Sequence, residues 1–325
     1  MVAQVGGARK GPSFDGAGTV EDDEKLPGGT RRINILVIVA YSVCCLVWGT
    51  TWFVVRQMVS PAAGSSPYLV AVIRFAFGVV LFVPLLVTFY RRLRAPNLHE
   101  CAWLIGAGTL NGLYQICVYH AEMHISGGLA AVVAATAPLM VALIAVATRT
   151  EKVSLRTIVG FCASLIGVAM VCHDRMTVSW AQAGATMIML LAAFFNACTN
   201  VTLKRASSAS LSPLVSAPLY LLFSTFPIWM TSLALSEPQN ISNIPAQSWY
   251  GLVYLSVMSS FLAFGLYLYM LKHMSLMAVS TLPFVLPVLA LIVDLFMEKS
   301  FTLSFESWAG IAVVLAGVVY SVVRR

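Results

Sequence analysis

Long apolar runs alternate with short polar segments along most of this chain. A helix that spans a membrane needs roughly 20 mainly apolar residues. Runs of about that length lie at residues 33–55, 68–90, 102–120, 126–148, 156–172, 182–203, 213–235, 249–271, 276–297 and 307–323. The pattern predicts an all-α membrane protein with ten transmembrane helices.

Residues 1–32 break this pattern, because they are rich in glycine and charge and poor in large apolar side chains. Such a segment cannot bury enough apolar surface to offset the entropy that it would lose on ordering. We expect a disordered tail. The apolar run that follows is predicted to be a retained helix rather than a cleaved signal peptide.

Positive charges between the runs predict which way the helices point, because cytoplasmic loops collect Lys and Arg. With the N-terminus in the cytoplasm, the inner segments carry thirteen basic residues: Arg31, Arg32, Arg91, Arg92, Arg94, Arg149, Lys152, Arg156, Lys204, Arg205, Lys272, Arg324 and Arg325. The outer segments carry three: Arg56, Arg175 and Lys299. The imbalance predicts that both termini, and therefore the 1–32 tail, are cytoplasmic.

Composition narrows the class of protein. Of the 325 residues, 59% are hydrophobic and 10% are charged, whereas soluble domains average about 25% charged residues. The net charge of +7 comes from scattered basic residues, without the pattern of a nucleic-acid-binding surface. The seven cysteines show no C-x-x-C spacing, so neither a zinc site nor a disulfide framework is expected. His120, Glu122 and His124 lie close together in the sequence and leave a metal site or a pH sensor as a minor alternative, but no metal and no cofactor are expected.

Two parts of the chain resemble each other. The segment "MHISGGLAAV" (123–132) leads into the fourth run, and "KHMSLMAV" (272–279) leads into the ninth. Each run ends in a Glu-Lys pair and is followed by two glycines seven residues apart, at Glu151, Lys152, Gly160 and Gly167 and at Glu298, Lys299, Gly310 and Gly317. Residues 33–175 and 176–325 are thus predicted to be duplicated halves. Five spans per half is an odd number, so the second half must be inverted, as in alternating-access transporters.

Several segments resemble a known family. They are "LVWGTTWF", "VIRFAFG", "AAVVAATAPLMVALIAVATRTEKVSLRTIVGFCASLIGVAMV" and "AVSTLPFVLPVLALIVDLFMEKS" followed by "WAGIAVVLAGVVY". They are similar to the EamA-type transporters of the drug/metabolite transporter superfamily over nearly everything after the tail. Pro283 and Pro287 flank the position that would mirror Pro138, and Asn196 stands where family members often carry an aromatic residue. The resemblance implies a ten-helix secondary transporter, usually an exporter of amino acids or related small metabolites.

The first run contains "CCLVWGTTWFVVRQM" (44–58), which places small polar residues between two tryptophans. Trp48, Thr51 and Trp52 are three and four positions apart and share a helix face. This face is interpreted either as an aromatic wall of a substrate cavity or as a tryptophan belt at the membrane interface.

Further candidates for substrate binding are polar side chains at four-residue spacing in the third and sixth runs, and a tyrosine on a serine-rich face of the eighth: Asn111, Gln115, Tyr119, Asn196, Asn200 and Tyr267. An amide that faces lipid loses its hydrogen bonds. These side chains are therefore expected to face the interior, where they either bind substrate or join helices.

Arg74 lies well inside the second run. An arginine at that depth is costly unless it faces a partner or water. Its planar fork suits the carboxylate of a metabolite. The structural alternatives are an ion pair with Asp294 or Glu122, or snorkelling to the surface.

Prolines and acids mark candidate gates. Pro138, Pro283 and Pro287 lie inside predicted spans, where they remove backbone hydrogen bonds and are expected to kink the helices. Glu151 and Glu298 are interpreted either as proton-coupling groups or as helix-end carboxylates that are solvated or paired with neighbouring lysines.

These features predict a secondary transporter of the plasma (inner) membrane that exports amino acids or related small polar metabolites by alternating access. The expected partners are a small-molecule substrate and the lipid bilayer, with no nucleic acid. A proton or substrate gradient is the expected driving force, because the chain has no G-x-x-x-x-G-K-[ST] loop for ATP. An intramembrane enzyme, or a channel or sensor, is the alternative, although H-E-x-x-H and G-x-S-x-G motifs are absent. A monomer and a homodimer both fit the sequence.

Overall fold

The computed structural model describes residues 35–59, 66–125, 130, 133–172, 180–206, 211–235, 241, 244–246, 248–297 and 304–322. The predicted tail at 1–32, Glu298 and the side chain of Asp294 lie outside the described residues. All the regular structure within these ranges is helical.

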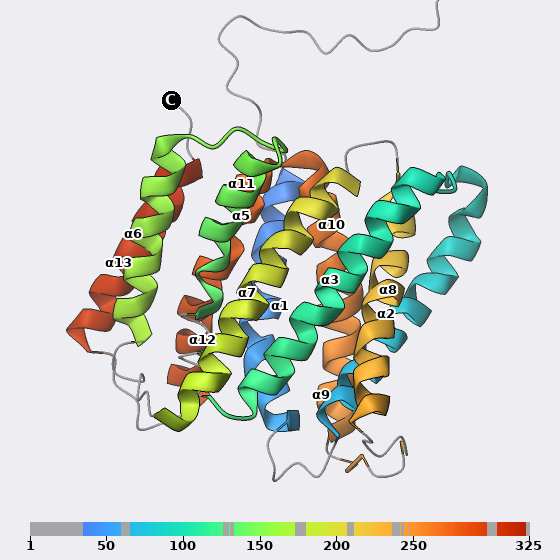
Figure 1. Ribbon diagram of the computed structural model, residues 1–325, viewed down its shortest axis with the longest axis horizontal. Helices are drawn as coiled ribbons and strands as arrows, with labels where there is room; N and C mark the ends of the chain where they lie inside the picture. Colours follow the sequence, from blue (N-terminus) through green and yellow to red (C-terminus); the bar gives the residue numbers. More distant parts are fainter. Residues whose placement is uncertain are drawn as a thin grey trace, which may run out of the picture. The chain divides into compact units, whose positions relative to one another are not determined.

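Six helical segments of the described ranges are long and apolar enough to cross a membrane. They comprise α1 (Ile35–Val59), α2 (Pro67–Phe89) with the 3-10 turn η2 (Tyr90–Arg92), α3 (Leu98–Glu122), α7 (Trp180–Ala206), α8 (Pro213–Ala234), and a continuous segment of α9 (Ser248–Tyr254), the π-helix η5 (Leu255–Ala263) and α10 (Phe264–His273). The shorter helices are α5 (Ala137–Ala147), α6 (Leu155–Cys172), α11 (Leu276–Val279), α12 (Leu282–Met297) and α13 (Phe305–Val322). They lie side by side in a helical bundle (Figure 1), the architecture of a multi-pass membrane protein.

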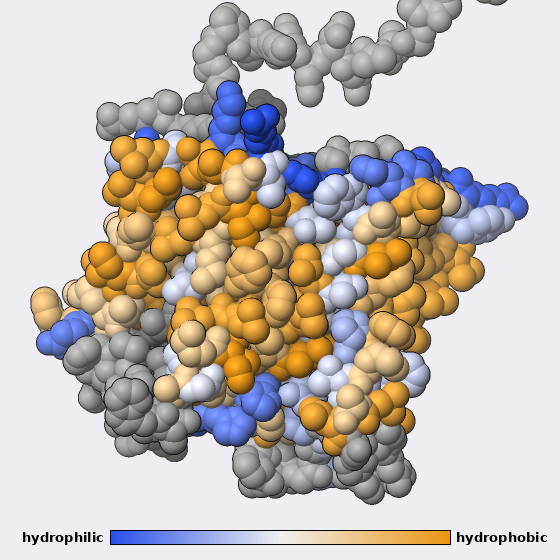
Figure 2. Space-filling view, in the orientation of Figure 1, coloured by the Kyte–Doolittle hydropathy of each residue, from blue (hydrophilic) through white to orange (hydrophobic). Residues whose placement is uncertain are grey.

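The outer surface of the bundle is largely apolar. Leu46, Val80, Leu143, Ile166 and Val319 are among the large hydrophobic side chains that are exposed. Figure 2 shows hydrophobic residues across the middle of one face and hydrophilic residues gathered along its upper edge. An exposed apolar surface of this extent is suited to lipid rather than to water.

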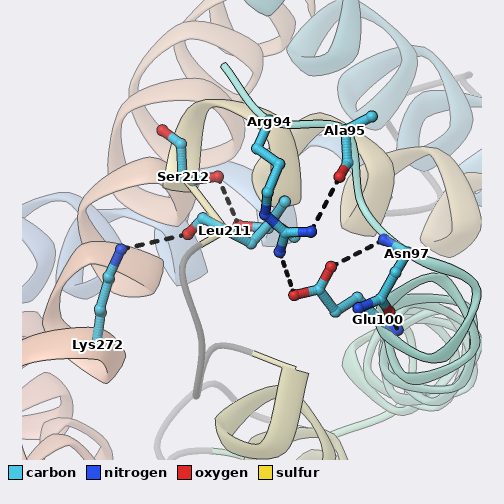
Figure 3. Close-up of polar contacts among 8 residues, drawn as sticks. Arg94, Ala95, Asn97, Glu100, Leu211, Ser212 and Lys272 are labelled. Atoms are coloured by element: carbon cyan, nitrogen blue, oxygen red, sulfur yellow. Dashed lines mark hydrogen bonds and ion pairs between the residues drawn. The ribbon is translucent and has the colours of Figure 1, made fainter. Parts of the chain in front are cut away.

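A capping box fixes the start of α3, the helix that carries Asn111, Gln115 and Tyr119. The Asn97 side chain accepts a hydrogen bond from the Glu100 N–H at 2.8 Å, and Glu100 Oε2 accepts one from the Asn97 N–H at 2.9 Å. Arg94 adds a 2.5 Å ion pair with Glu100 Oε1 and a hydrogen bond to the Ala95 carbonyl (Figure 3). With its first turn held in this way, α3 runs to Glu122 at its other end.

Helices α6 and α13 pack closely because glycines face each other. A Cβ added to Gly160 would lie 2.7 Å from the Gly317 carbonyl oxygen, and one added to Gly167 would lie 2.8 Å from the Gly310 carbonyl oxygen. Since the residue numbers rise on one helix as they fall on the other, the two helices are antiparallel. These glycine faces are therefore used for packing inside the chain.

The fourth and ninth runs are not continuous helices. Turns at residues 135–136 and 280–281 precede α5 and α12. In each turn a threonine hydroxyl donates to the carbonyl oxygen three residues back at 2.7 Å, from Thr136 to Val133 and from Thr281 to Ala278. The same short motif, Thr-x-Pro, therefore builds a break at the corresponding place in both halves of the sequence.

The break also changes what two of the prolines do. Pro138 and Pro283 are the second residues of α5 and α12, where a backbone N–H would have no intrahelical partner in any case. They begin a helix after a turn, instead of kinking a continuous span as the sequence suggested. Pro287 does lie inside α12.

Candidate functional site

Arg74 on α2 lies in the interior of the bundle, with 3% of its surface exposed. Its Nε donates to the Ser260 hydroxyl at 3.2 Å, its Nη2 to the Ser259 hydroxyl at 2.7 Å, and its Nη1 to the Tyr119 hydroxyl at 3.3 Å. A guanidinium carries five N–H donors. One N–H on Nη1 and one on Nη2 are left, the number that a bidentate carboxylate requires.

The positive charge of Arg74 has no anion in contact with it among the described residues, where the one ion pair is between Arg94 and Glu100. An ion pair with Glu122, one of the structural alternatives, is not formed, although the two groups still interact electrostatically over a longer distance. The other partner that the sequence offered, Asp294, has its side chain outside the described residues. The snorkelling alternative does not hold either, because the side chain is buried. Within the described part of the chain, three neutral hydroxyls therefore hold this cation, and no contact there neutralises its charge.

Two local features bring the serines to Arg74. Gly78 lies one turn further along the same face of α2, and a Cβ there would lie 2.8 Å from Ser260 Cβ, so only glycine permits this approach. Ser259 and Ser260 are adjacent in sequence and belong to η5, a π-helix of nine residues. Its i→i+5 hydrogen bonds make a wider turn than those of an α-helix, and π-helical turns are frequent at functional sites.

Aromatic and amide side chains from three helices form a second set of contacts. The centre of the Trp48 ring, on α1, lies 5.3 Å from the centre of the Tyr267 ring and 5.4 Å from that of the Phe264 ring, both on α10. The Tyr267 hydroxyl donates to Asn200 Oδ1 of α7 at 2.5 Å, and Asn200 Nδ2 donates to Asn196 Oδ1 at 3.2 Å. Four of the residues singled out in the sequence are thus connected.

The arginine and the aromatic chain are contiguous. The Arg74 guanidinium carbon lies 5.1 Å from the centre of the Phe75 ring. The centres of the Phe75 and Phe264 rings are 6.1 Å apart. We call the whole set the central cluster, consisting of Trp48, Arg74, Phe75, Tyr119, Asn196, Asn200, Ser259, Ser260, Phe264 and Tyr267. It draws on α1, α2, α3, α7, η5 and α10.

Gln115 lies one turn before Tyr119 on α3. It is 6% exposed and makes no hydrogen bond to a described residue. Its amide atoms are nevertheless not fully enclosed, because the one enclosed and unpaired side-chain atom in the described ranges belongs to Glu122. A substrate-binding role for Gln115 stays a prediction.

Three predicted site residues make their contacts elsewhere. Asn111 donates to the Ser224 hydroxyl of α8 at 3.0 Å, so its amide joins α3 to α8. The Thr51 hydroxyl donates to the Val47 carbonyl of its own helix at 2.8 Å. Trp52 packs against a smaller apolar cluster of α3 and α7.

Glu151 joins the two halves of the chain. Its Oε2 accepts a hydrogen bond from the Met277 N–H, at the start of α11, at 3.1 Å, instead of pairing with the neighbouring lysine. Lys204 of α7 interacts electrostatically with Glu151. Its Nζ donates hydrogen bonds to the carbonyl oxygens of Leu271 and Met274, at the end of α10, at 2.5 and 2.7 Å. These contacts fit a structural or gating role, which stays a prediction.

The sequence placed Ser259 and Ser260 on the serine-rich face of Tyr267 as a weak signal, and it did not assign Phe75 or Phe264 to the site. The available signal was a pair of adjacent serines within an apolar run, and in a regular α-helix adjacent residues do not face the same partner. Because the π-helical turn was not foreseen, the two serines were not connected with Arg74.

Comparison with known proteins shows which proteins this chain resembles. The crystal structure of a protein 17% identical in sequence superposes with a TM-score of 0.71, covering 88% of this chain and 96% of that chain, so the fold is shared. Protein PecM of Dickeya dadantii is 26% identical over 298 residues, covering 86% of this chain and 89% of PecM. An uncharacterized transporter of Archaeoglobus fulgidus is 24% identical over 289 residues, covering 86% of this chain and 95% of the relative. An uncharacterized transporter of Synechocystis sp. is 23% identical over 289 residues, covering 84% and 85%. The sequence profile of the EamA-like transporter family matches residues 35–172 and again residues 183–323, so this chain belongs to the EamA-like transporter family.

Proposed function

We propose that this protein is a secondary transporter whose substrate is a small polar metabolite with a carboxylate group, held by Arg74. Amino acids and related metabolites, exported across the plasma membrane by alternating access, are the class and direction that we propose. The observation that carries the proposal is a buried guanidinium that contacts no carboxylate of the described residues and has two N–H groups left over there.

The energetics favour an anionic ligand. An arginine at the centre of a membrane helix costs about 2.5–3.5 kcal/mol on insertion scales. The hydroxyls of Ser259, Ser260 and Tyr119 satisfy hydrogen bonds but carry no negative charge. A substrate carboxylate supplies both hydrogen-bond acceptors and a negative charge, and each charge-assisted hydrogen bond contributes roughly 1.5–3 kcal/mol. The unbonded Gln115 amide is a further polar group for the remainder of the substrate.

The proposed machinery is a pair of inverted five-helix halves, 33–175 and 176–325, with ten spans and both termini in the cytoplasm. Three observations support it: the two successive profile matches, the shared Thr-x-Pro breaks, and the antiparallel packing of α6 on α13. Discontinuous helices at corresponding places in two inverted halves are typical of secondary transporters. Conformational exchange between such halves would open the central cluster to either side in turn.

Exchange assays in liposomes test the proposal. Purified protein is reconstituted and screened for exchange of labelled amino acids and simple monocarboxylates, and the best substrate is compared with its uncharged amide analogue. We expect Arg74→Lys to weaken substrate binding about ten- to a hundredfold, because the charge stays while the bidentate fork is lost. Arg94→Lys, an arginine outside the central cluster, is the matched control and should bind as the wild type does.

The result opposed to the proposal is equal weakening of the carboxylate and of its amide by Arg74→Lys. That outcome would mean that Arg74 supports the fold without touching the substrate. Chemical conversion of the added compounds would instead favour an intramembrane enzyme, and passive ion conductance without exchange would favour a channel.

A further inference from the structure

Glu122, the last residue of α3, is a buried acid that plays no part in the contacts described for Arg74. It is 6% exposed, and its Oε2 atom is fully enclosed without a hydrogen-bond partner. No described residue donates a hydrogen bond to either carboxylate oxygen. Buried carboxylates in folded proteins are normally paired or hydrogen-bonded, so this exception points to a function.

Charged and titratable neighbours face Glu122 from three helices. Arg74 of α2 and Arg56 of α1 interact with it as cations. Tyr114 and Tyr119 of α3 itself interact with it as neutral hydroxyls. The cations favour the ionised carboxylate, and Arg74 is the one that lies in the central cluster.

The remaining surroundings favour the neutral acid. From α7, the apolar side chains of Ala185 and Met189 pack on this end of α3, around Ala121. Tyr220 of α8 interacts with Tyr114 and not with Glu122. The last turn of a helix also carries partial negative charge on its carbonyl groups, which opposes a carboxylate placed there. Opposed influences of this kind allow the group to bind and release a proton.

We propose that Glu122 is the proton-binding site of this transporter, and that a proton on Glu122 crosses the membrane together with a substrate carboxylate on Arg74. The inference rests on the proposed function of Arg74. Ionised Glu122 partly offsets the charge of Arg74 and repels an incoming carboxylate. A proton on Glu122 removes that negative charge, and Arg74 then attracts the substrate without opposition.

The proton and charge balance is simple. A proton from water bonds to a carboxylate oxygen of Glu122, the substrate binds, and after the conformational change the proton returns to water on the other side as the substrate leaves. One proton and one carboxylate group cross together, so a monocarboxylate crosses as a neutral pair and a zwitterionic amino acid crosses with one net positive charge. Export by this route is driven by an outward gradient of the substrate, because the proton leaves with it. Because linkage is reciprocal, a bound carboxylate raises the proton affinity of Glu122 by the same factor as the proton raises the affinity for the carboxylate.

The first test measures binding against pH, using the amino acid or monocarboxylate that exchanges best in the liposome screen. Wild-type affinity should rise about 5- to 150-fold as the pH falls, the range typical of coupling between linked sites. Glu122→Gln, which resembles the protonated acid, should bind the substrate tightly across the whole pH range of the titration. It should still exchange substrate, but a pH gradient should no longer drive net transport.

Two control variants isolate Glu122 from other titrating groups. Glu100→Gln removes the buried acid at the opposite end of α3 and should keep the pH dependence of the wild type. His120→Gln removes an imidazole that is two residues from Glu122 in the sequence and whose Nδ1 lies 3.3 Å from the Tyr68 hydroxyl. This variant should also keep the pH dependence of the wild type. Loss of the pH dependence in His120→Gln, or its survival in Glu122→Gln, overturns the proposal.

A second readout needs no substrate. Infrared difference spectra of the purified protein between neutral and mildly acidic pH should show a protonated carboxyl band that Glu122→Gln lacks and Glu100→Gln retains. If Glu122→Gln does not fold, Glu122→Asp keeps a titratable group and should keep pH-dependent binding with a displaced midpoint; pH-independent binding by it overturns the proposal. If the wild type exchanges no carboxylate at all, the proposed function fails. If it does exchange a carboxylate but Glu122→Gln changes neither the pH dependence of binding nor the infrared band, only the proton site is refuted.

Discussion

Replacing Gly78 with alanine tests how the Arg74 contacts are assembled. The added Cβ would lie 2.8 Å from Ser260 Cβ and 3.4 Å from Leu221 Cδ1. Non-bonded carbon atoms are most favourable at about 3.5–4.0 Å, so Ser260 must retreat by roughly 1 Å. The bond from Arg74 Nε to the Ser260 hydroxyl is already 3.2 Å long, and a retreat of that size breaks it.

The expected loss of stability follows from these contacts. A lost hydrogen bond to a charged group costs about 1.5–3 kcal/mol, and overpacking costs about 1–3 kcal/mol. Alanine recovers up to about 1 kcal/mol, because it favours a helix more than glycine does. We expect Gly78→Ala to lower the free energy of unfolding by about 1.5–5 kcal/mol. Denaturant unfolding in detergent micelles, followed by tryptophan fluorescence, measures the difference.

Two further variants separate the clash from other causes. Gly184→Ala on α7 is the matched control, because no atom lies within 4 Å of the added Cβ. It should be neutral, or stabilising by up to about 1 kcal/mol. The double variant Gly78→Ala/Ser260→Gly removes the clashing Cβ and should recover part of the loss, but not the hydrogen bond to Arg74. If Gly78→Ala is as stable as Gly184→Ala, the close approach does not hold the serines in place and the reasoning is refuted.

Three other predictions concern the aromatic chain, the glycine contact and the topology. Tyr267→Phe keeps the ring but leaves Asn200 Oδ1 without its donor, so the free energy of unfolding should fall by about 1–3 kcal/mol in the same assay; an unchanged value contradicts the 2.5 Å hydrogen bond. Gly160→Ala would bring a Cβ within 2.7 Å of a backbone oxygen of α13, which cannot rotate away, and should cost about 1–3 kcal/mol. In a cysteine-free background, an impermeant thiol reagent applied to intact cells should label Gln239→Cys and not Ala95→Cys, and the reverse pattern would invert the proposed topology.

Local sequence features predicted the helices well because they depend on the neighbours along the chain. The apolar run at 213–235 became α8 at Pro213–Ala234, and the run at 68–90 became α2 at Pro67–Phe89. Membrane-spanning length is a property of consecutive residues, so it can be read without knowing the packing. The two discontinuous runs are the exception, since there a Thr-x-Pro turn interrupts the apolar pattern without changing its composition.

The candidate site was predicted only in part. That Arg74 must face the interior followed from its cost in lipid, and the stripe of Tyr119 on α3 and the separate stripe of Asn200 on α7 each followed from helical spacing. The sequence did not predict which of these polar side chains hydrogen-bond to each other or to other helices. Asn111 has the same spacing as Gln115, yet it bonds Ser224 across the α3–α8 contact while Gln115 stays unbonded.

By itself the sequence determined that this chain lies in a membrane, where its helices run, and which polar side chains turn inward, because composition and periodicity act on residues that are close along the chain. The tertiary structure decided which of those side chains meet. Arg74 and Ser260 are 186 residues apart and touch only because Gly78 admits η5 at close range. Glu122, at the end of α3, has an enclosed and unpaired Oε2 atom in the described part of the chain and interacts with Arg74 of α2, which is 48 residues away in the sequence. Contacts of this range depend on the packing of whole helices, which no local pattern of residues specifies.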